Sequence, residues 1–247
     1  MGFHNVVRIS LCILGLMVHP AYADGIEQGP PARVNFSGEI GYDARTIRSH
    51  IDLLAIQREE IDHQKASFNL RLYLADPRRV YPTPVLHLSG GLGLAGRGSD
   101  NTGRGYAWDA GLGVGAHLRL TRWVYLTPLV GAQYQAQQYD RTAGRRELAW
   151  KGLWMGLEGT LDGLPPWELS VGAQTHWSSL DHALGGKDIP AGRFTGLVLG
   201  TTAGYRLTKN TGLALKYQRG RWESKGADKP RLELNADLVA ASLNIQY

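Results

Sequence analysis

The feature that most constrains this chain is a long stretch in which every second residue is apolar. It runs from residue 106 to residue 120 without interruption. Successive side chains of a β-strand point to opposite faces, so this period of two predicts a strand with one apolar and one polar face. The stretch is far longer than a usual strand of about 5–6 residues. Its apolar positions are Tyr106, Trp108, Ala110, Leu112, Val114, Ala116, Leu118 and Leu120.

Further stretches with the same period follow one another along the chain. They cover residues 34–43, 66–74, 86–94, 123–138, 147–161, 167–178, 193–207, 211–222 and 233–247. The least regular is 147–161, because Trp150 and Trp154 fall on the face opposite Leu153 and Leu157, and we expect a β-bulge there. The pattern predicts an all-β fold: a closed up-and-down antiparallel barrel of ten strands, within a range of about eight to twelve.

The connections between these stretches differ in length. We expect them at 44–65, 75–83, 96–105, 120–123, 138–147, 161–166, 178–193, 207–211 and 221–234. After the first, a longer connection tends to alternate with a compact one that contains turn residues, such as Lys209-Asn210. Long loops at one end and tight turns at the other resemble the Gram-negative outer-membrane β-barrels, whose tight turns face the periplasm.

Aromatic residues fall near the predicted strand ends, as expected for side chains at the two lipid headgroup zones. Trp123, Trp167, Tyr205 and Tyr247 fall at the periplasmic ends. The predicted outer girdle comprises Tyr42, Tyr106, Trp108, Tyr134, Trp177, Phe194, Tyr217 and Trp222.

Both ends of the chain resemble export and insertion signals. Residues 1–23 have the order of a cleaved signal peptide, with a short apolar stretch and a small-x-small site at Ala21 to Ala23, leaving 24–247 as the barrel. The only cysteine, Cys12, lies in that stretch. Alternating Leu243, Ile245 and Tyr247 resemble the C-terminal insertion signal of outer-membrane proteins, which implies the barrel-assembly machinery as a partner.

The charge of the chain fits a membrane surface better than a nucleic acid. The net charge is +5 and the pI about 9.3, but the basic residues are scattered and concentrate in predicted outer loops. We expect them to contact outer-membrane lipids and lipopolysaccharide phosphates, and we expect no nucleic-acid partner. These residues are Arg97, Arg104, Arg141, Arg145, Arg146, Arg193, Arg219, Arg221, Lys225 and Lys229.

A secreted soluble β-sandwich or lipocalin-like barrel is the alternative fold. Such proteins also alternate, but their apolar face points inward and their strands are shorter. Here the face opposite the leucines carries glycine, amide and charged residues, so we assign the leucines to lipid and the polar face to the lumen. The expected lumen residues are Glu39, Arg71, His87, Asp109, His117, Arg119, Glu168, His176, Lys216 and Asp237.

Two different interiors are compatible with these residues. Barrels of about eight strands are filled by side chains, and wide aqueous channels need about sixteen. Ten strands favour an interior filled by ion-paired side chains. Lumen glycines such as Gly111 and Gly113 favour a narrow passage for a small solute or ion, or room for bulky neighbours. We expect no cofactor and no metal site.

An enzymatic alternative rests on His176 and Ser178, which could act as base and nucleophile. The pair is similar to the His-x-Ser element of the lipid A deacylases, although Ser179 replaces their asparagine and the pair would face the lumen. Asp181-His182 resembles the catalytic pair of the ten-stranded omptin proteases, but with different spacing. The sequence therefore predicts an outer-membrane protein with a porin-like passage or a structural and surface-interaction role, with an outer-membrane hydrolase as the alternative.

Overall fold

The computed structural model describes residues 33–52, 55–75, 82–95, 105–141, 144–184, 187–225 and 231–246. All its regular elements are β-strands, and no described helix is long and apolar enough to cross a membrane. The expected signal peptide, residues 1–23, and Tyr247 lie outside the described residues. The strands are β1 (Arg33–Asp52), β2 (Ala55–Tyr73), β3 (Thr83–Ala95), β4 (Gly105–Arg119), β5 (Val124–Arg141), β6 (Gly144–Leu164), β7 (Trp167–Leu184), β8 (Lys187–Arg206), β9 (Thr211–Lys225) and β10 (Arg231–Gln246).

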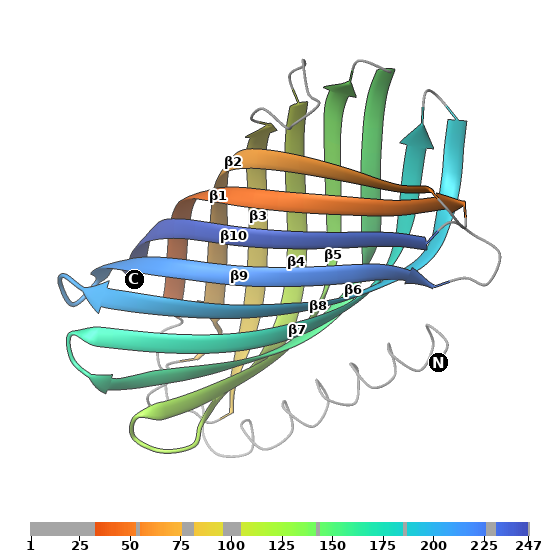
Figure 1. Ribbon diagram of the computed structural model, residues 1–247. Coiled ribbons are helices and arrows are strands. Elements are labelled where there is room, and N and C mark those ends of the chain that lie inside the picture. Colours follow the sequence, from red (N-terminus) through yellow and green to blue (C-terminus); the bar gives the residue numbers. More distant parts are fainter. Residues whose placement is uncertain are drawn as a thin grey trace.

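The ten strands form a closed antiparallel barrel in which each strand pairs with its neighbours in sequence. The first and last strands complete the ring, with pairs running from Asn35↔Gln246 to His50↔Arg231. Figure 1 shows β1, β10 and β9 crossing in front of the steeply inclined β3, β4 and β5, as expected for strands tilted relative to a barrel axis. The predicted fold and strand number are confirmed.

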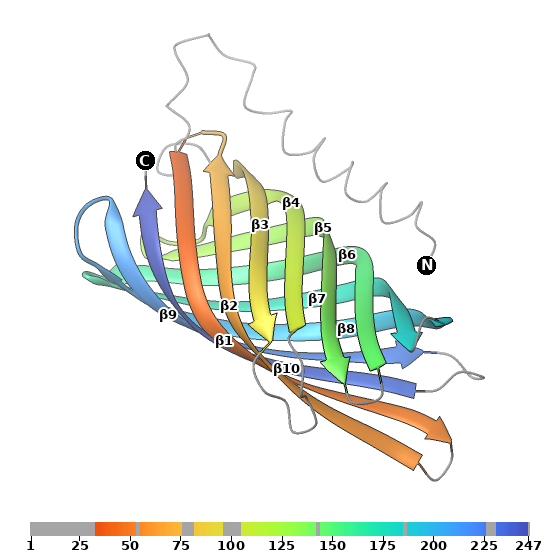
Figure 2. The ribbon, with the colours of Figure 1, turned by 90° about the horizontal axis from the view of Figure 1, so that it is seen from above.

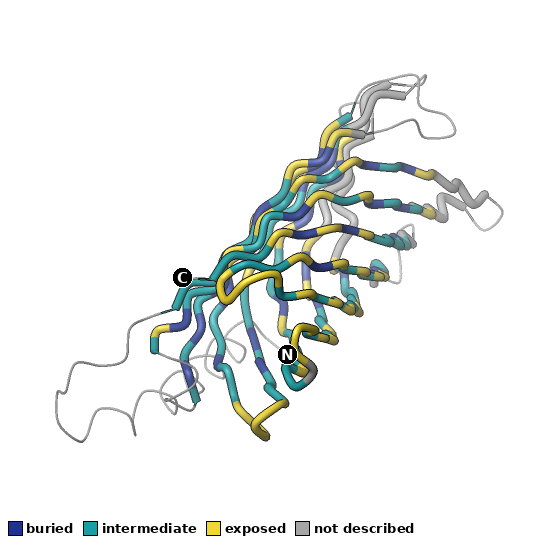
Figure 3. The backbone as a smooth tube through the Cα atoms, turned by 90° about the vertical axis from the view of Figure 1, so that its left-hand side faces the viewer, coloured by how far each residue is buried: buried dark blue, intermediate teal, exposed yellow. Residues whose placement is uncertain are grey.

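The outer face of the barrel is apolar, and its side chains alternate with covered ones along each strand (Figure 3). Ile40 is 77% exposed, Leu92 71% and Leu215 66%, whereas the neighbouring polar Glu39 is 7% exposed. A soluble barrel would expose the polar face and bury these side chains. The arrangement therefore matches a sheet whose outer surface meets lipid.

Most of the aromatic residues predicted for the two girdles lie on this outer face. Trp108 stacks on Tyr134, with ring centroids 4.7 Å apart, and Trp167 contacts Tyr205 at 5.0 Å. The prediction was wrong for Phe194 and Trp222, which are 0% and 6% exposed and point into the lumen. Tyr134 is half-buried, and the other predicted girdle residues that the structure describes are exposed: Tyr42, Tyr106, Trp108, Trp123, Trp167, Trp177, Tyr205 and Tyr217.

The strands extend further at the loop end than the sequence indicated. The expected first connection, 44–65, is wrong: strand pairing continues to Asp52↔Ala55. The hairpins β5–β6, β7–β8 and β9–β10 also replace much of the expected loops at 138–147, 178–193 and 221–234. Figure 2 shows the β1–β2 hairpin projecting past its neighbours. Backbone hydrogen bonding thus continues beyond the region where apolar alternation marks the strands.

The expected bulge in 147–161 is also absent. β6 pairs with β5 in one continuous register, and its only register shift against β7 falls between Leu161 and Leu164. Trp150 and Trp154 therefore simply point into the barrel, where they are 1% and 5% exposed. Since the lumen accepts these rings, no bulge is needed to turn them outward.

Candidate functional site

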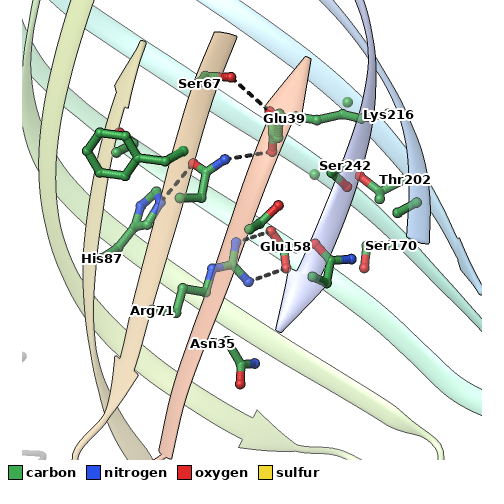
Figure 4. A pocket seen from close by; sticks show the side chains of 18 of the residues that line it. Asn35, Glu39, Ser67, Arg71, His87, Glu158, Ser170, Thr202, Lys216 and Ser242 are labelled. Atoms are coloured by element: carbon green, nitrogen blue, oxygen red, sulfur yellow. Dashed lines mark hydrogen bonds and ion pairs between the residues drawn. The ribbon is translucent and has the colours of Figure 1, made fainter. Parts of the chain in front are cut away.

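The lumen is crossed by an ion pair between strands that do not touch each other. Arg71 on β2 donates two hydrogen bonds of 2.6 Å each to the two carboxylate oxygens of Glu158 on β6. Figure 4 shows the two side chains meeting inside the barrel. A bidentate pair of this kind is strong and fixes its own geometry. It acts as a strut between opposite walls and divides the lumen at this level.

A second charged group lies beside the strut. The Glu39 carboxylate accepts hydrogen bonds from Asn69 at 2.6 Å, from Ser67 at 3.2 Å and from the Lys216 ammonium at 3.2 Å (Figure 4). Asn69 in turn contacts His87 Nε2 at 3.4 Å. β10 separates the strands of Glu39 and Lys216, so this group joins the seam of the barrel through side chains as well as backbone.

The remaining lumen carboxylates also have cationic partners. Asp109 pairs with Lys65 at 2.5 Å. At the end with the tight turns, Arg206 lies 2.9 Å from Asp162 and 3.7 Å from Glu168. Pairing of this kind is what makes charged groups tolerable inside a membrane protein. The charges of the inner wall therefore largely cancel each other.

These groups surround a cavity of about 360 Å³. Its lining reaches from Lys65 and Asp109 near the middle of the barrel to Lys209, Asn210 and Gln246 at the tight-turn end. The volume lies at the lower end of the range for ligand pockets, about 300–1,000 Å³. The cavity is thus a chamber that extends to the end of the barrel with the tight turns.

Toward the loop end the lumen is filled by an apolar cluster, which we call the plug. It consists of Ile61, Leu148, Trp150, Phe194, Trp222 and Leu234, each 0–6% exposed. On β2, Ile61 lies four positions nearer the loop end than Lys65, which lines the cavity. The same spacing toward the loop end separates four further plug residues from cavity-lining residues of their own strands: Trp150 from Trp154, Phe194 from Val198, Trp222 from Gln218, and Leu234 from Leu238. The plug therefore forms the next layer outward from the chamber.

Arg45 adds to the plug from β1, the strand between β2 and β10. Its guanidinium donates a 2.6 Å hydrogen bond to Asp43, donates a 3.1 Å hydrogen bond to Gln137 on β5, and lies 5.6 Å from the Trp150 ring centroid. β1 and β5 are not neighbours in the ring, so the contact with Gln137 spans the lumen. Arginine over an indole adds a cation–π attraction.

Glycines make the space that the large rings occupy. A Cβ atom at Gly220 or Gly196 would lie 2.2 Å or 2.0 Å from the Trp222 ring. A Cβ at Gly113 or Gly131 would lie 2.8 Å or 2.7 Å from Trp154. Of the two roles expected for lumen glycines, these four therefore serve to admit bulky neighbours.

The two candidate catalytic residues do not form a dyad. His176 and Ser178 point into the lumen and are 3% and 7% exposed. His176 Nδ1 contacts Gln133 at 2.7 Å. His176 Nε2 and Ser178 Oγ have no hydrogen-bond partner within the described residues. Base and nucleophile must be in hydrogen-bond reach, so this geometry provides no activated serine. The side chains of Asp181 and His182 lie outside the described residues.

Most predicted lumen residues lie inside the barrel. His117 stacks on Tyr125, with centroids 4.9 Å apart, and accepts or donates a 2.9 Å hydrogen bond with Thr127. Arg119 is exposed at the tight-turn end, where it donates to the Thr121 carbonyl. The exception is Asp237, which lies on the outer face and accepts a 2.7 Å hydrogen bond from Tyr217. Polar residues occupy the outer face near the loop end, so polarity alone misplaced Asp237.

Several lumen residues were not among those predicted. Glu158, Asp43, Arg45 and Gln137 lie inside the barrel together with the four rings of Trp150, Trp154, Phe194 and Trp222. If side chains alternate strictly along each strand and the leucines point outward, all of these residues fall on the inner face. No group of three or more histidine, cysteine or acidic side chains in the described part of the chain could hold a metal.

Comparison with known proteins gives a likeness of fold. No protein-family model matches the chain, and no curated protein matches it in sequence. The solved structure of the outer membrane protease OmpT from Escherichia coli is similar, with a TM-score of 0.56 at 13% identity over 92% of this chain and 99% of that one.

Two further outer-membrane structures show a weaker likeness. The translocator domain of autotransporter NalP from Neisseria meningitidis has a TM-score of 0.43 at 12% identity, covering 97% of this chain and 95% of that one. Neisserial surface protein A has a TM-score of 0.40 at 12% identity, covering 86% and 97%. With its closed ring of ten antiparallel strands and its apolar outer face, the chain has the fold of the Gram-negative outer-membrane β-barrels.

Proposed function

We propose that this chain is an integral outer-membrane protein with a structural or surface-interaction role and a barrel closed to free diffusion. The observation that carries the proposal is the plug, whose residues come from β2, β6, β8, β9 and β10 and fill the lumen beyond the chamber. Protein interiors packed in this way leave few voids larger than a water molecule. A solute in the chamber therefore meets an apolar barrier toward the loop end.

The outer surface supports a role at the cell surface. Arg219 and Arg221, both on the outer face of β9, are 69% and 61% exposed, and Lys151 on β6 is exposed as well. Cations placed beyond the apolar band can pair with lipopolysaccharide phosphates. Outward Leu243 and Ile245 support recognition of the last strand by the assembly machinery.

Planar-bilayer recording tests the proposal. Refolded wild-type protein should produce no discrete conductance steps, whereas a Trp150→Ala/Trp222→Ala variant, which loses the two largest plug rings, should conduct. Trp177→Ala removes an outward indole that is 45% exposed and serves as the matched control, which should stay silent. Regular steps from the wild-type protein would contradict the closed barrel and support a narrow passage.

A further inference from the structure

We propose that the chamber is a binding site for an uncharged, polyhydroxylated solute of up to disaccharide size, reached from the tight-turn end. The proposal is independent of whether the barrel conducts. It rests on two properties of the wall of the chamber: every lining carboxylate is already paired with a cation, and a set of amide and hydroxyl groups has no hydrogen-bond partner within the described residues.

The paired charges select against ions. The carboxylates that line the cavity are Glu39, Asp109, Glu158 and Glu168. Each has a cation within 2.5–3.7 Å: Lys216, Lys65, Arg71 and Arg206, respectively. Lys209, at the tight-turn end, has no ion pair within the described residues. Deeper in the chamber, an anionic solute would need one of the four paired cations to leave its carboxylate, and a cationic solute would need the reverse. An uncharged solute requires neither exchange, and it can still donate hydroxyl hydrogens to free carboxylate lone pairs.

Most of the unpaired polar groups lie on one arc of the wall. The Arg71–Glu158 strut joins β2 to β6, and β7 to β10 lie on one side of it. Ser89 on β3 and Gln135 on β5, on the other side, also line the cavity without a side-chain hydrogen bond within the described part of the chain. On β7 to β10, six inward-facing lining residues make no such bond: Gln174 on β7, Thr202 on β8, Gln218 on β9, and Ser242, Asn244 and Gln246 on β10.

These groups suit a sugar or a polyol. Amides and hydroxyls can both donate and accept, which matches solute hydroxyls that do the same. Thr202 and Ser242 lie opposite the strut and close to Lys216 in Figure 4. The cavity of about 360 Å³ corresponds to about twelve waters at about 30 Å³ each, so a small solute fits by displacing water.

Two glycines preserve the position of the amides. A Cβ at Gly156 would lie 2.8 Å from Gln174 Cγ, and one at Gly200 would lie 3.1 Å from Gln218 Cγ. The side chains of Gln174 and Gln218 therefore occupy space that a side chain at Gly156 or Gly200 on the adjacent strand would take. Gly172 differs, because a Cβ there would meet only the Leu157 carbonyl oxygen at 3.7 Å, an ordinary contact. A longer side chain at Gly172 can enter the cavity without a clash at its base.

Isothermal titration calorimetry of the refolded full chain in detergent tests the site. The probes are glucose and maltose, with citrate and spermidine as charged comparisons. We expect saturable binding of at least one sugar and none of the ions. Gly172→Leu, which fills the chamber, should weaken sugar binding at least tenfold. Gly159→Leu is the matched control and should bind like wild type, because a Cβ at Gly159 points outward and meets only Val171 at 3.8 Å.

A Gln174→Ala/Gln218→Ala variant keeps the cavity open and removes two of the unpaired amides, so it should also weaken binding. The proposal is overturned if neither sugar binds the folded wild-type protein, if Gly172→Leu binds as well as Gly159→Leu, or if citrate or spermidine binds more tightly than the sugars.

Discussion

Arg71 and Glu158 are 87 residues apart in sequence, yet they form two hydrogen bonds of 2.6 Å across the interior of the barrel. Their side chains are only 24% and 25% exposed. Because the lumen around them is narrow, removal of one side chain leaves the charge of the other without a partner and without full hydration. The pair therefore couples the two walls that it joins.

Breaking this strut should cost more than replacing it. Arg71→Met leaves Glu158 partly buried and unpaired, and we expect a loss of about 1–3 kcal/mol in the free energy of unfolding. The double variant Arg71→Met/Glu158→Gln should recover part of that loss. Urea unfolding of Arg71→Met, Glu158→Gln and the double variant in lipid vesicles, followed by tryptophan fluorescence, gives the coupling energy. Strictly additive effects would show that the two side chains do not depend on each other.

The glycine cradle of Trp222 should be intolerant of side chains. Gly220→Val puts methyl groups where the indole lies, and we expect a destabilisation of about 1–3 kcal/mol from overpacking. Gly159→Val, on the outer face, is the control and should change stability by less. The same vesicle unfolding experiment measures both variants. Equal effects would mean that the loss arises from strand propensity rather than from the ring.

A charged side chain on the outer face should destabilise the barrel more the nearer it lies to the middle of the bilayer. Leu112 is 51% exposed and lies between Trp108, near the loop end of β4, and Trp123, in the tight turn that follows β4, so Leu112→Arg should destabilise the folded barrel by about 2–4 kcal/mol. Glu147→Arg changes an exposed residue near the loop end of β6, where we expect about 0–1 kcal/mol. Folding yield into vesicles and urea midpoints report the difference. A tolerant Leu112 position would argue against lipid contact.

Loss of His176 and Ser178 should leave lipid A unchanged. The two side chains are buried and share no hydrogen bond, so a His176→Ala/Ser178→Ala variant removes no activated nucleophile. Mass spectra of lipid A from cells that express the wild type, the variant or neither should be identical. Deacylated lipid A that appears only with the wild-type protein would restore the hydrolase alternative.

The sequence predicted the barrel well because alternation reports which face of each strand meets lipid. It predicted strand ends poorly for a related reason. In 44–52 and 55–65 both faces of the hairpin are largely polar, so the period disappears while the backbone pairing between Thr46 and Glu60 continues. Hydrogen bonding between strands, unlike burial, leaves no trace in residue type.

The lumen was only partly predictable. Phe194, Trp222 and Asp237 were misplaced by residue type, since aromatic rings suit both headgroup zones and packed interiors and carboxylates suit both lumen and surface. Parity with Leu197, Leu215 and Val239 assigns all three correctly. The contact between Arg71 and Glu158 could not be predicted from alternation. It depends on the tilt of the strands and the closure of the ring, which the pattern of a single strand does not show.

The seam between β1 and β10 has a consequence for how this protein is made. Its pairs join the first strand of the fold to the last, from Asn35↔Gln246 to His50↔Arg231. An N-terminal fragment of any length therefore leaves β1 with one unsatisfied edge, which hydrocarbon does not tolerate. The ring of backbone hydrogen bonds can therefore close only once the residues of β10 are present.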